Sequence, residues 1–161
     1  MAGIITGVYG YQRSGKSLMA YLLAKSYYLQ GYKVYTNVET KNYIKINKLT
    51  DIKVNNTPKV LWLDEAQYYL DSRTWQNNTK SSIFFNSVGK QNILLLLTTI
   101  SPDMVEKRLR EQHNYIIFAD NNDKYFKYRI IDVYRKRMKE IYLRKDDKLF
   151  ESIDYDSSKV P

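Results

Sequence analysis

The chain has 161 residues, 43% of them hydrophobic and 14% aromatic, which suffices for one domain with a buried core and excludes a disordered tail. It contains no cysteine, which excludes a disulfide framework and any thiolate metal site. The formal net charge of +9 favours polyanionic partners such as nucleic acid, although ordinary solubility explains the charge equally well.

No targeting segment is expected, because the first ten residues carry neither a basic leader nor a cleavage site. The longest apolar stretch, residues 93–97, is far shorter than the roughly 20 residues that a membrane-spanning helix needs. We therefore expect a soluble, cytoplasmic protein with no membrane segment in this chain.

The first third of the chain predicts a strand, a helix and a second strand. Residues 4–9 are an apolar run that predicts a buried strand. Residues 17–29 carry apolar side chains at helical spacing, and Gly31 then ends the predicted helix. Residues 33–38 predict the second strand, and residues 40–58 predict a polar loop with a short strand or turn inside it.

The middle third continues this alternation. Residues 60–63 and 93–99 are apolar runs that predict two more buried strands. Residues 66–70 are expected to begin a helix or to form a turn. Helices are expected at residues 82–89 and 102–112, the latter with a serine cap and a proline in its first turn. Strands that alternate with helices predict an α/β fold, in which helices cover both faces of a mostly parallel sheet.

The last third predicts a hairpin and a polar tail. A strand is expected at residues 115–119, and the polar turn after it leads back into a second strand at residues 125–133. Residues 139–144 predict one more strand. We therefore expect one domain over residues 1–145, ending in a C-terminal β-hairpin, and a loosely ordered tail over residues 146–161.

The strongest motif lies between the first predicted strand and the first predicted helix, where residues 10–17 read GYQRSGKS. This is the P-loop pattern, in which glycines let backbone N–H groups surround a phosphate at a helix N-terminus. Lys16 is expected to reach the β- and γ-phosphates of ATP, and Ser17 to ligate Mg²⁺. The expected nucleotide-binding residues are Gly10, Tyr11, Gln12, Arg13, Ser14, Gly15, Lys16, Ser17 and Leu18.

The second motif is the strand that ends in Asp64 and Glu65. Ligands bind at the carboxyl ends of parallel strands, so both carboxylates are expected to face the P-loop. Asp64 would hold Mg²⁺ or its water shell, and Glu65 would polarise the attacking water as a general base. An acidic strand end alone is common, but together with a P-loop it indicates a nucleoside triphosphate site.

Further catalytic candidates are two threonines and three arginines. Thr98 and Thr99 end a predicted strand, where either could contact the γ-phosphate or serve only as a β-branched strand residue. Arg73, Arg108 and Arg110 are candidates for neutralising transition-state charge, although each could equally be a solvated side chain.

Two further features are expected on the surface of the protein, the single histidine and a basic run. The single histidine, His113, has no evident metal or nucleophile partner and is expected on the surface. The basic and aromatic run at residues 134–139 could track a phosphate backbone or form a solvated hairpin face.

Four segments, taken in order, resemble the zonula occludens toxin-like ATPases, which are filamentous phage assembly proteins of the wider FtsK–HerA class of DNA-pumping and genome-packaging ATPases. The segments are GYQRSGKS (residues 10–17), VYTN (34–37), LWLDEAQYYLDSR (61–73) and GKQNILLLLTTISP (89–102). The resemblance covers roughly residues 3–120.

The resemblance implies a RecA-like core that hydrolyses ATP and forms a homo-oligomeric ring, through whose pore DNA is moved, with an arginine supplied across the subunit interface. Lys16, Ser17, Asp64 and Glu65 carry over from the family pattern, and Arg73 matches a frequent arginine. It further implies a viral capsid or portal protein as a partner and a place in the host cytoplasm.

This chain departs from the family pattern in two ways. Ile100 stands where the family often has glutamine, which shifts the expected γ-phosphate contact to Thr99. Membrane-anchored relatives also carry a transmembrane segment and a second domain. Their absence is expected of a soluble packaging ATPase or of a motor domain alone.

Two other functions remain open at this stage. Thymidine kinases combine a P-loop with an Asp-Glu-Ala-Gln segment, but they usually add a cysteine zinc site that this chain lacks. An assembly or scaffold protein could bind ATP and turn it over slowly, and it would oligomerise on ATP without stimulation by DNA.

Overall fold

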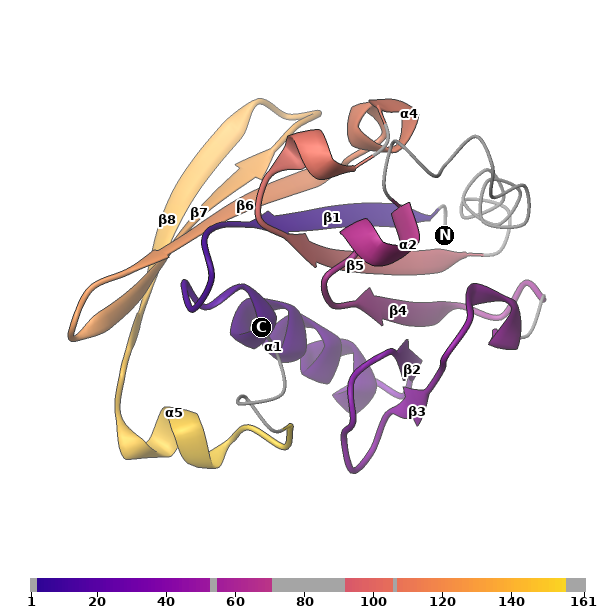
Figure 1. Ribbon diagram of the computed structural model, residues 1–161, viewed down its shortest axis with the longest axis horizontal. Coiled ribbons are helices and arrows are strands. Elements are labelled where there is room, and N and C mark those ends of the chain that lie inside the picture. The colour runs from indigo at the N-terminus through magenta and orange to yellow at the C-terminus, as the bar shows by residue number, and fades with distance from the viewer. Residues whose placement is uncertain (1–2, 53–54, 71–91, 106, 156–161) are drawn as a thin grey trace.

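The computed structural model describes residues 3–52, 55–70, 92–105 and 107–155. One eight-stranded sheet with the order β3-β2-β4-β5-β1-β6-β7-β8 forms its centre (Figure 1). The strands are β1 (Ile4–Tyr9), β2 (Lys33–Thr36), β3 (Ile44–Lys45), β4 (Lys59–Leu63), β5 (Ile93–Thr99), β6 (Tyr115–Asn121), β7 (Tyr125–Asp132) and β8 (Arg137–Arg144). The pairings among β1 to β6 are parallel, and those of β6 with β7 and of β7 with β8 are antiparallel.

β1 lies between two strands that come much later in the sequence. Ile4 is opposite Leu94 of β5, and Thr6 is opposite Tyr115 of β6. Because these strands are parallel, the carboxyl ends of β1, β4 and β5 meet at one edge of the sheet. The loop that follows β1 therefore opens between two strands at the edge where ligands bind in open α/β sheets.

Helices cover both faces of the sheet, as the sequence predicts. They are α1 (Lys16–Leu29), α2 (Gln67–Leu70), α4 (Lys107–Glu111) and α5 (Asp147–Glu151), together with the 3₁₀ turns η1 (Leu49–Asp51) and η3 (Pro102–Met104). α1 packs on one face of β4 and β5 through Ala20, Tyr21 and Ala24. On the other face, Val105 and the α4 residue Leu109 join a core with the alternate side chains of the same strands.

The two central strands are buried along their whole length. Every residue of β4 and of β5 is buried, because α1 covers one face and η1 and α4 lie against the other. This explains why residues 93–99 read as a continuous apolar run rather than as an alternating one. The stiffness of this centre fixes the position of the carboxylates at its edge.

The helix predicted over residues 102–112 is interrupted. Ser101 caps its start as expected, since its hydroxyl accepts a hydrogen bond from the Asp103 N–H. Val105 then adopts an extended conformation (φ −104°, ψ 143°) and is fully buried. Burial of this side chain breaks the segment into η3 and α4. The helix predicted over residues 82–89 lies outside the described residues.

The C-terminal segment is more ordered than predicted. The Asp146 side chain caps α5 by accepting a hydrogen bond from the Leu149 N–H. Tyr155 packs edge-on against Trp62 of β4 with ring centroids 5.7 Å apart, and it forms a bridge with Thr40. Aromatic burial thus holds this segment against the α1 side of the sheet. Within the described part of the chain, none of the helices has the length and apolar character needed to cross a bilayer.

Candidate functional site

The loop after β1 has the backbone conformation of a phosphate cradle. Gly15 has φ 99°, and a Cβ there would lie 2.6 Å from both Phe126 and the Tyr128 hydroxyl. Only glycine fits both the dihedral angle and the space. No side chain caps the start of α1 and no acidic residue lies in its first turn, so its free N–H groups and positive helix end remain available to an anion.

Lys16 is folded back across this loop. Its Nζ donates hydrogen bonds to the carbonyl oxygens of Gly10 (2.9 Å) and Tyr11 (3.2 Å). The residue is 4% exposed, and burial lowers the pKa of its ammonium, while the nearby carboxylates of Glu65 and Asp64 oppose that shift. A phosphate in the loop would supply the charge that best compensates this burial.

Asp64, directly after β4, accepts hydrogen bonds from two hydroxyl groups. Its Oδ1 accepts hydrogen bonds from Ser17 Oγ at 2.7 Å and from Thr98 Oγ1 at 2.8 Å. Burial raises the pKa of this carboxyl, and the two hydrogen bonds act in the opposite direction. Hydroxyl and carboxylate oxygens are the hard ligands that Mg²⁺ prefers, so the donor set fits that ion.

The described residues hold no cluster of three or more acidic or histidine side chains that could bind a metal unaided. A magnesium ion at this position would therefore be shared with the phosphates of a nucleotide, as is usual for Mg²⁺ sites.

Asn37, just after β2, holds the backbone of Asp64 on both sides. Its Nδ2 donates to the Asp64 carbonyl and its Oδ1 accepts from the Asp64 N–H, both at 2.8 Å. In the sequence this residue stands out only as part of the family segment VYTN, which predicts no role for it. The one feature that could have pointed to it is its position, since it is a polar residue at the carboxyl end of β2, the strand beside β4.

Glu65 occupies a conformation that is unusual for a residue with a side chain. Its φ is 54°, and its N–H donates to Thr98 Oγ1 at 3.0 Å. Burial raises the pKa of its carboxyl, and the negative charge of Asp64 adds to the effect. The carboxylate accepts a hydrogen bond from Gln67 Nε2 at 3.3 Å. A positioned carboxylate with a raised pKa is suited to accept a proton from water.

Side chains from the antiparallel part of the sheet support the cradle from outside. The Tyr128 hydroxyl donates to the Gly15 carbonyl at 2.8 Å, and Asn121 Nδ2 donates to the Arg13 carbonyl at 2.8 Å. Lys145 Nζ in turn donates to Asn121 Oδ1 at 3.0 Å. These three residues are not predictable from the sequence pattern, because they lie more than a hundred positions after the loop and carry no local motif.

The other loop residues divide by exposure. Tyr11 is 83% exposed, and Gln12 and Arg13 are exposed as well. Ser14 is buried, and its hydroxyl has no hydrogen-bond partner among the residues that the structure describes. The side chain of Leu18 packs in the core against Val8, so its backbone N–H alone can face a nucleotide.

Thr99 and Arg110, two of the candidate catalytic residues, have other partners in the structure. Thr98, not Thr99, contacts the acidic pair, since its hydroxyl bonds the Asp64 carboxylate and the Glu65 N–H. The Thr99 hydroxyl instead points to Met104 Sδ at 3.7 Å. Arg110 forms an ion pair with Asp103 at 3.4 Å. Arg73 and the side chain of Arg108 lie outside the described residues.

The expectation for His113 is wrong. The residue is 2% exposed, and its ring bonds the Tyr9 hydroxyl and the Leu109 carbonyl. Burial lowers the pKa of the imidazole. It lies in the short segment between α4 and β6 and stacks on Tyr9 of β1, a position that a solitary histidine in a polar segment does not reveal.

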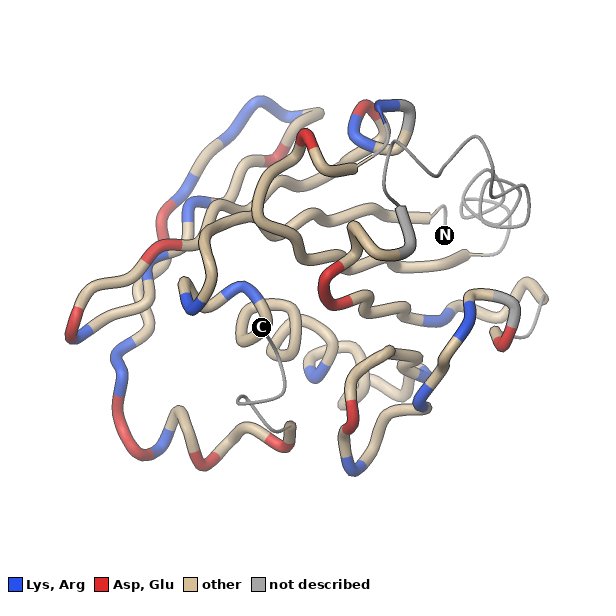
Figure 2. Tube along the Cα trace, viewed as in Figure 1, with Lys and Arg blue, Asp and Glu red and all other residues tan. Residues whose placement is uncertain are grey.

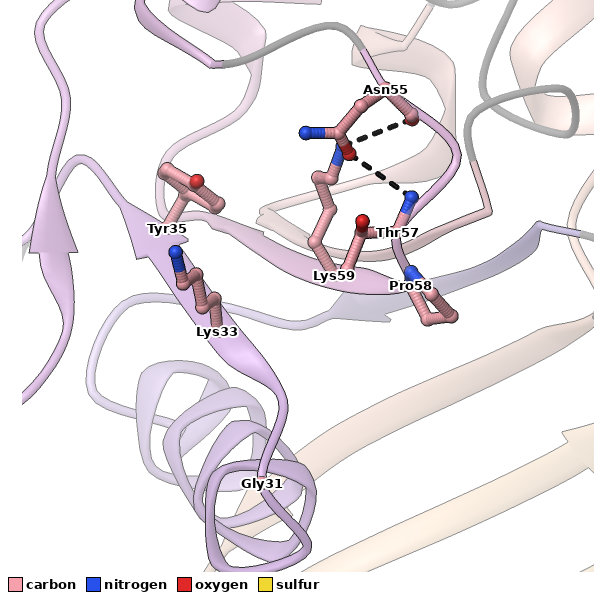
Figure 3. Close-up of a pocket in the computed structure, with 7 residues that line it drawn as sticks. All are labelled: Gly31, Lys33, Tyr35, Asn55, Thr57, Pro58 and Lys59. Carbon is pink, nitrogen blue, oxygen red and sulfur yellow. Dashed lines mark hydrogen bonds between the residues drawn. The ribbon is translucent and has the colours of Figure 1, made fainter.

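A separate hollow of about 190 Å³ lies at the opposite, amino edge of the sheet. Figure 3 shows Lys33 and Lys59, the first residues of β2 and β4, with Asn55 above them. Lys59 Nζ donates to Asn55 Oδ1 at 2.7 Å and to the Asn55 carbonyl at 3.2 Å. This lysine holds the loop before β4, and the hollow is not part of the site around Asp64.

The family model that matches the sequence is the ATPase family associated with various cellular activities (AAA), over residues 6–121. The match covers more than two thirds of the chain and spans every motif residue of the site. No curated protein matches the sequence.

Solved structures of similar fold come from a bacterium and from viruses. The N-terminal domain of zonular occludens toxin from Neisseria meningitidis has a TM-score of 0.66 at 16% identity, covering 97% of this chain and 100% of that one. The genome packaging NTPase B204 of Sulfolobus turreted icosahedral virus 2, in complex with ATP-gammaS, has a TM-score of 0.67 at 15% identity, covering 86% and 96%. B204 of Sulfolobus turreted icosahedral virus, a DNA-packaging ATPase, has a TM-score of 0.66 at 18% identity, covering 85% and 96%. These likenesses confirm the fold that the resemblance to zonula occludens toxin-like ATPases predicts.

Proposed function

Since the chain belongs to the ATPase family associated with various cellular activities, we propose that it is an ATP-driven motor that translocates or packages DNA, in phage genome packaging or assembly. One observation carries the proposal: the phosphate cradle and the Asp64–Glu65 pair meet at one edge of the sheet. The chain's net charge of +9 and the similar fold of two viral packaging ATPases support DNA as the substrate that is moved.

The residues of the cradle would bind ATP by its phosphates. Backbone N–H groups at residues 10–18 would surround the β-phosphate, and Lys16 would exchange its carbonyl partners for the β- and γ-oxygens. Ser17 and Asp64 would hold Mg²⁺, which when bound neutralises charge that develops on the phosphates. Thr98 keeps the Asp64 carboxylate aimed at Ser17.

Glu65 would act as the general base for hydrolysis. It would accept a proton from the water that attacks the γ-phosphate, with its backbone fixed by Thr98. Thr99 remains a candidate for a γ-phosphate contact only if its hydroxyl turns away from Met104.

An arginine of a neighbouring subunit in a homo-oligomeric ring would neutralise the negative charge of the transition state that Lys16 and Mg²⁺ leave uncompensated. The candidates are Arg73, Arg108 and Arg110. Arg110 would first have to leave Asp103, with which it now pairs. A viral capsid or portal protein would be the further partner, in the host cytoplasm.

The test is steady-state ATP hydrolysis with and without double-stranded DNA, for the wild type and for Glu65→Gln. We expect DNA to stimulate hydrolysis, and the variant to bind ATP while its rate falls about 10²-fold or more, because a general base contributes roughly that much. Full turnover by the variant would show that Glu65 is not the base.

Hydrolysis that is indifferent to DNA would contradict the motor. It would favour the assembly or scaffold function, which predicts oligomers on ATP addition without DNA stimulation. Transfer of phosphate to added thymidine would instead favour a nucleoside kinase.

A further inference from the structure

The net charge of the chain is concentrated in one element. Residues 124–145, which form the β7–β8 hairpin, contain nine lysines and arginines against two acidic residues, which leaves a local charge of +7 out of the total of +9. The remaining 139 residues therefore carry only +2. Figure 2 shows this as blue segments along the hairpin and at its turn. Charge that served solubility alone would not need to be concentrated in one hairpin.

The basic side chains at the turn are free of acidic partners. Within the described part of the chain, no carboxylate lies at ion-pair distance from the four basic side chains of residues 134–139, and all four are exposed. By contrast, Lys127 and Arg129 in the middle of the hairpin pair with Glu140 at 3.7 and 3.5 Å. The turn thus presents uncompensated positive charge. Its basic residues are Arg135, Lys136, Arg137 and Lys139.

The exposed hydrophobic side chains of the hairpin are mostly tyrosines. Of five large ones, three are Tyr125, Tyr134 and Tyr142, with Tyr134 69% exposed. A tyrosine hydroxyl can bond a phosphate and its ring can pack on a sugar or a base. Interleaved arginine, lysine and tyrosine on an exposed strand fit a nucleic-acid backbone better than an acidic protein patch.

The hairpin is also connected to the ATP site. Tyr128 of β7 bonds the Gly15 carbonyl, and Lys145, just after β8, bonds Asn121, which bonds the Arg13 carbonyl. A ligand that moves the hairpin therefore acts on the phosphate cradle through side chains in direct contact with it.

We propose that the β7–β8 hairpin is the surface through which this ATPase contacts the phosphate backbone of nucleic acid, with Arg135, Lys136 and Arg137 at its turn as the main contacts. This inference rests on the proposed function, and it names the surface that the function requires. It also gives DNA stimulation a structural path, from the hairpin to Gly15 and Arg13.

The test compares two triple variants that remove the same charge. One is Arg135→Gln, Lys136→Gln, Arg137→Gln at the turn, and its matched control is Lys33→Gln, Lys41→Gln, Lys107→Gln at exposed positions elsewhere. Binding of a fluorescein-labelled 30-base-pair duplex is measured by anisotropy over a series of salt concentrations. ATP hydrolysis without DNA is measured alongside, because neither set of residues belongs to the site.

We expect the turn variant to bind the duplex about tenfold more weakly or worse at physiological salt. The slope of log K against log salt should fall by about 2 to 3, since each lost phosphate contact removes about 0.9. The control should keep the wild-type slope, and both variants should keep the wild-type rate without DNA.

The failures of the inference and of the proposed function are distinguishable. A turn variant that binds DNA as the wild type does, or a control that is weakened equally, overturns the hairpin while the motor stands. A wild-type protein that does not bind the duplex overturns both the hairpin surface and the motor. Binding to vesicles of acidic lipid but not to the duplex would have the same meaning.

Discussion

At the scale of single residues, Tyr128 is notable because it reaches the phosphate cradle from a strand outside the nucleotide motifs. Its hydroxyl is the donor to the Gly15 carbonyl, and its ring is fully buried. Together with Phe126 it fills the space that a side chain at Gly15 would need. The conformation of the loop thus depends on two aromatic residues that no nucleotide motif includes.

Removing only this hydroxyl tests its role. Tyr128→Phe keeps the ring, so we expect the KM for ATP to rise several-fold and the free energy of unfolding to fall by about 1 kcal/mol, typical for one hydrogen bond. The control is Tyr142→Phe, which loses an exposed hydrogen bond to Glu140 and should change neither quantity. An unchanged KM in Tyr128→Phe would assign the residue to packing alone.

The burial of His113 makes the free energy of unfolding depend on pH. Burial lowers the pKa of its imidazole in the folded state, while the unfolded state keeps the ordinary value near 6.5. Below about pH 6.5 the unfolded chain therefore binds a proton that the folded chain does not. The free energy of unfolding is therefore unaffected by this group above about pH 6.5, and it decreases as the pH falls below that value, by up to about 1.4 kcal/mol per pH unit.

Urea unfolding at pH 7.5 and pH 5.5 checks this expectation. The wild type should lose stability between the two values, and His113→Gln, although less stable at pH 7.5, should lose less. Equal losses would show that other groups cause the pH dependence.

At the scale of elements, the C-terminal segment acts as a clamp on the α1 side of the sheet. Tyr155 contacts the rings of Trp62 and Tyr21, at centroid distances of 5.7 and 5.2 Å. Its backbone also bridges to Thr40. Tyr155 thus joins three segments that are distant in sequence, two through its ring and the third through its backbone.

Tyr155→Ala should lower the free energy of unfolding by about 2 kcal/mol, because a large, partly buried side chain is removed and a gap is left against the core. Thermal unfolding measures the change. Tyr134→Ala is the control, since that ring is 69% exposed and its loss should shift stability by less than about 0.5 kcal/mol. A Tyr155→Ala protein as stable as the control would mean that the segment does not clamp the sheet.

The elements also show what sequence patterns can and cannot predict. Apolar runs predicted β1, β4 and β5 almost to the residue, because buried parallel strands have a composition of their own. The interruption at Val105 could not be predicted, since it depends on a core contact rather than on local preference. The order of residues 146–155 was not predicted, because single tyrosines in a polar stretch give no periodic signal.

At the scale of the whole molecule, the site was predictable where chemistry fixes the residue types. Lys16, Ser17 and Asp64 follow from the spacing that a nucleotide's phosphates and Mg²⁺ demand, and the structure brings them together. Which of two adjacent threonines faces the carboxylates was not predictable, because it depends on how the strand is turned. Asn121 and Tyr128 required knowledge of the sheet order, which joins segments over a hundred residues apart.

The position of β1 between β5 and β6 also has a consequence for how the protein is made. β1 is synthesised before both of its partner strands, since Leu94 and Tyr115 come about 90 and 110 residues later in the sequence. Such distant pairings raise the contact order, which slows folding. The nascent chain therefore carries β1 as an unpaired apolar strand until β5 has been made, and a holding chaperone is expected to protect it from aggregation during that time.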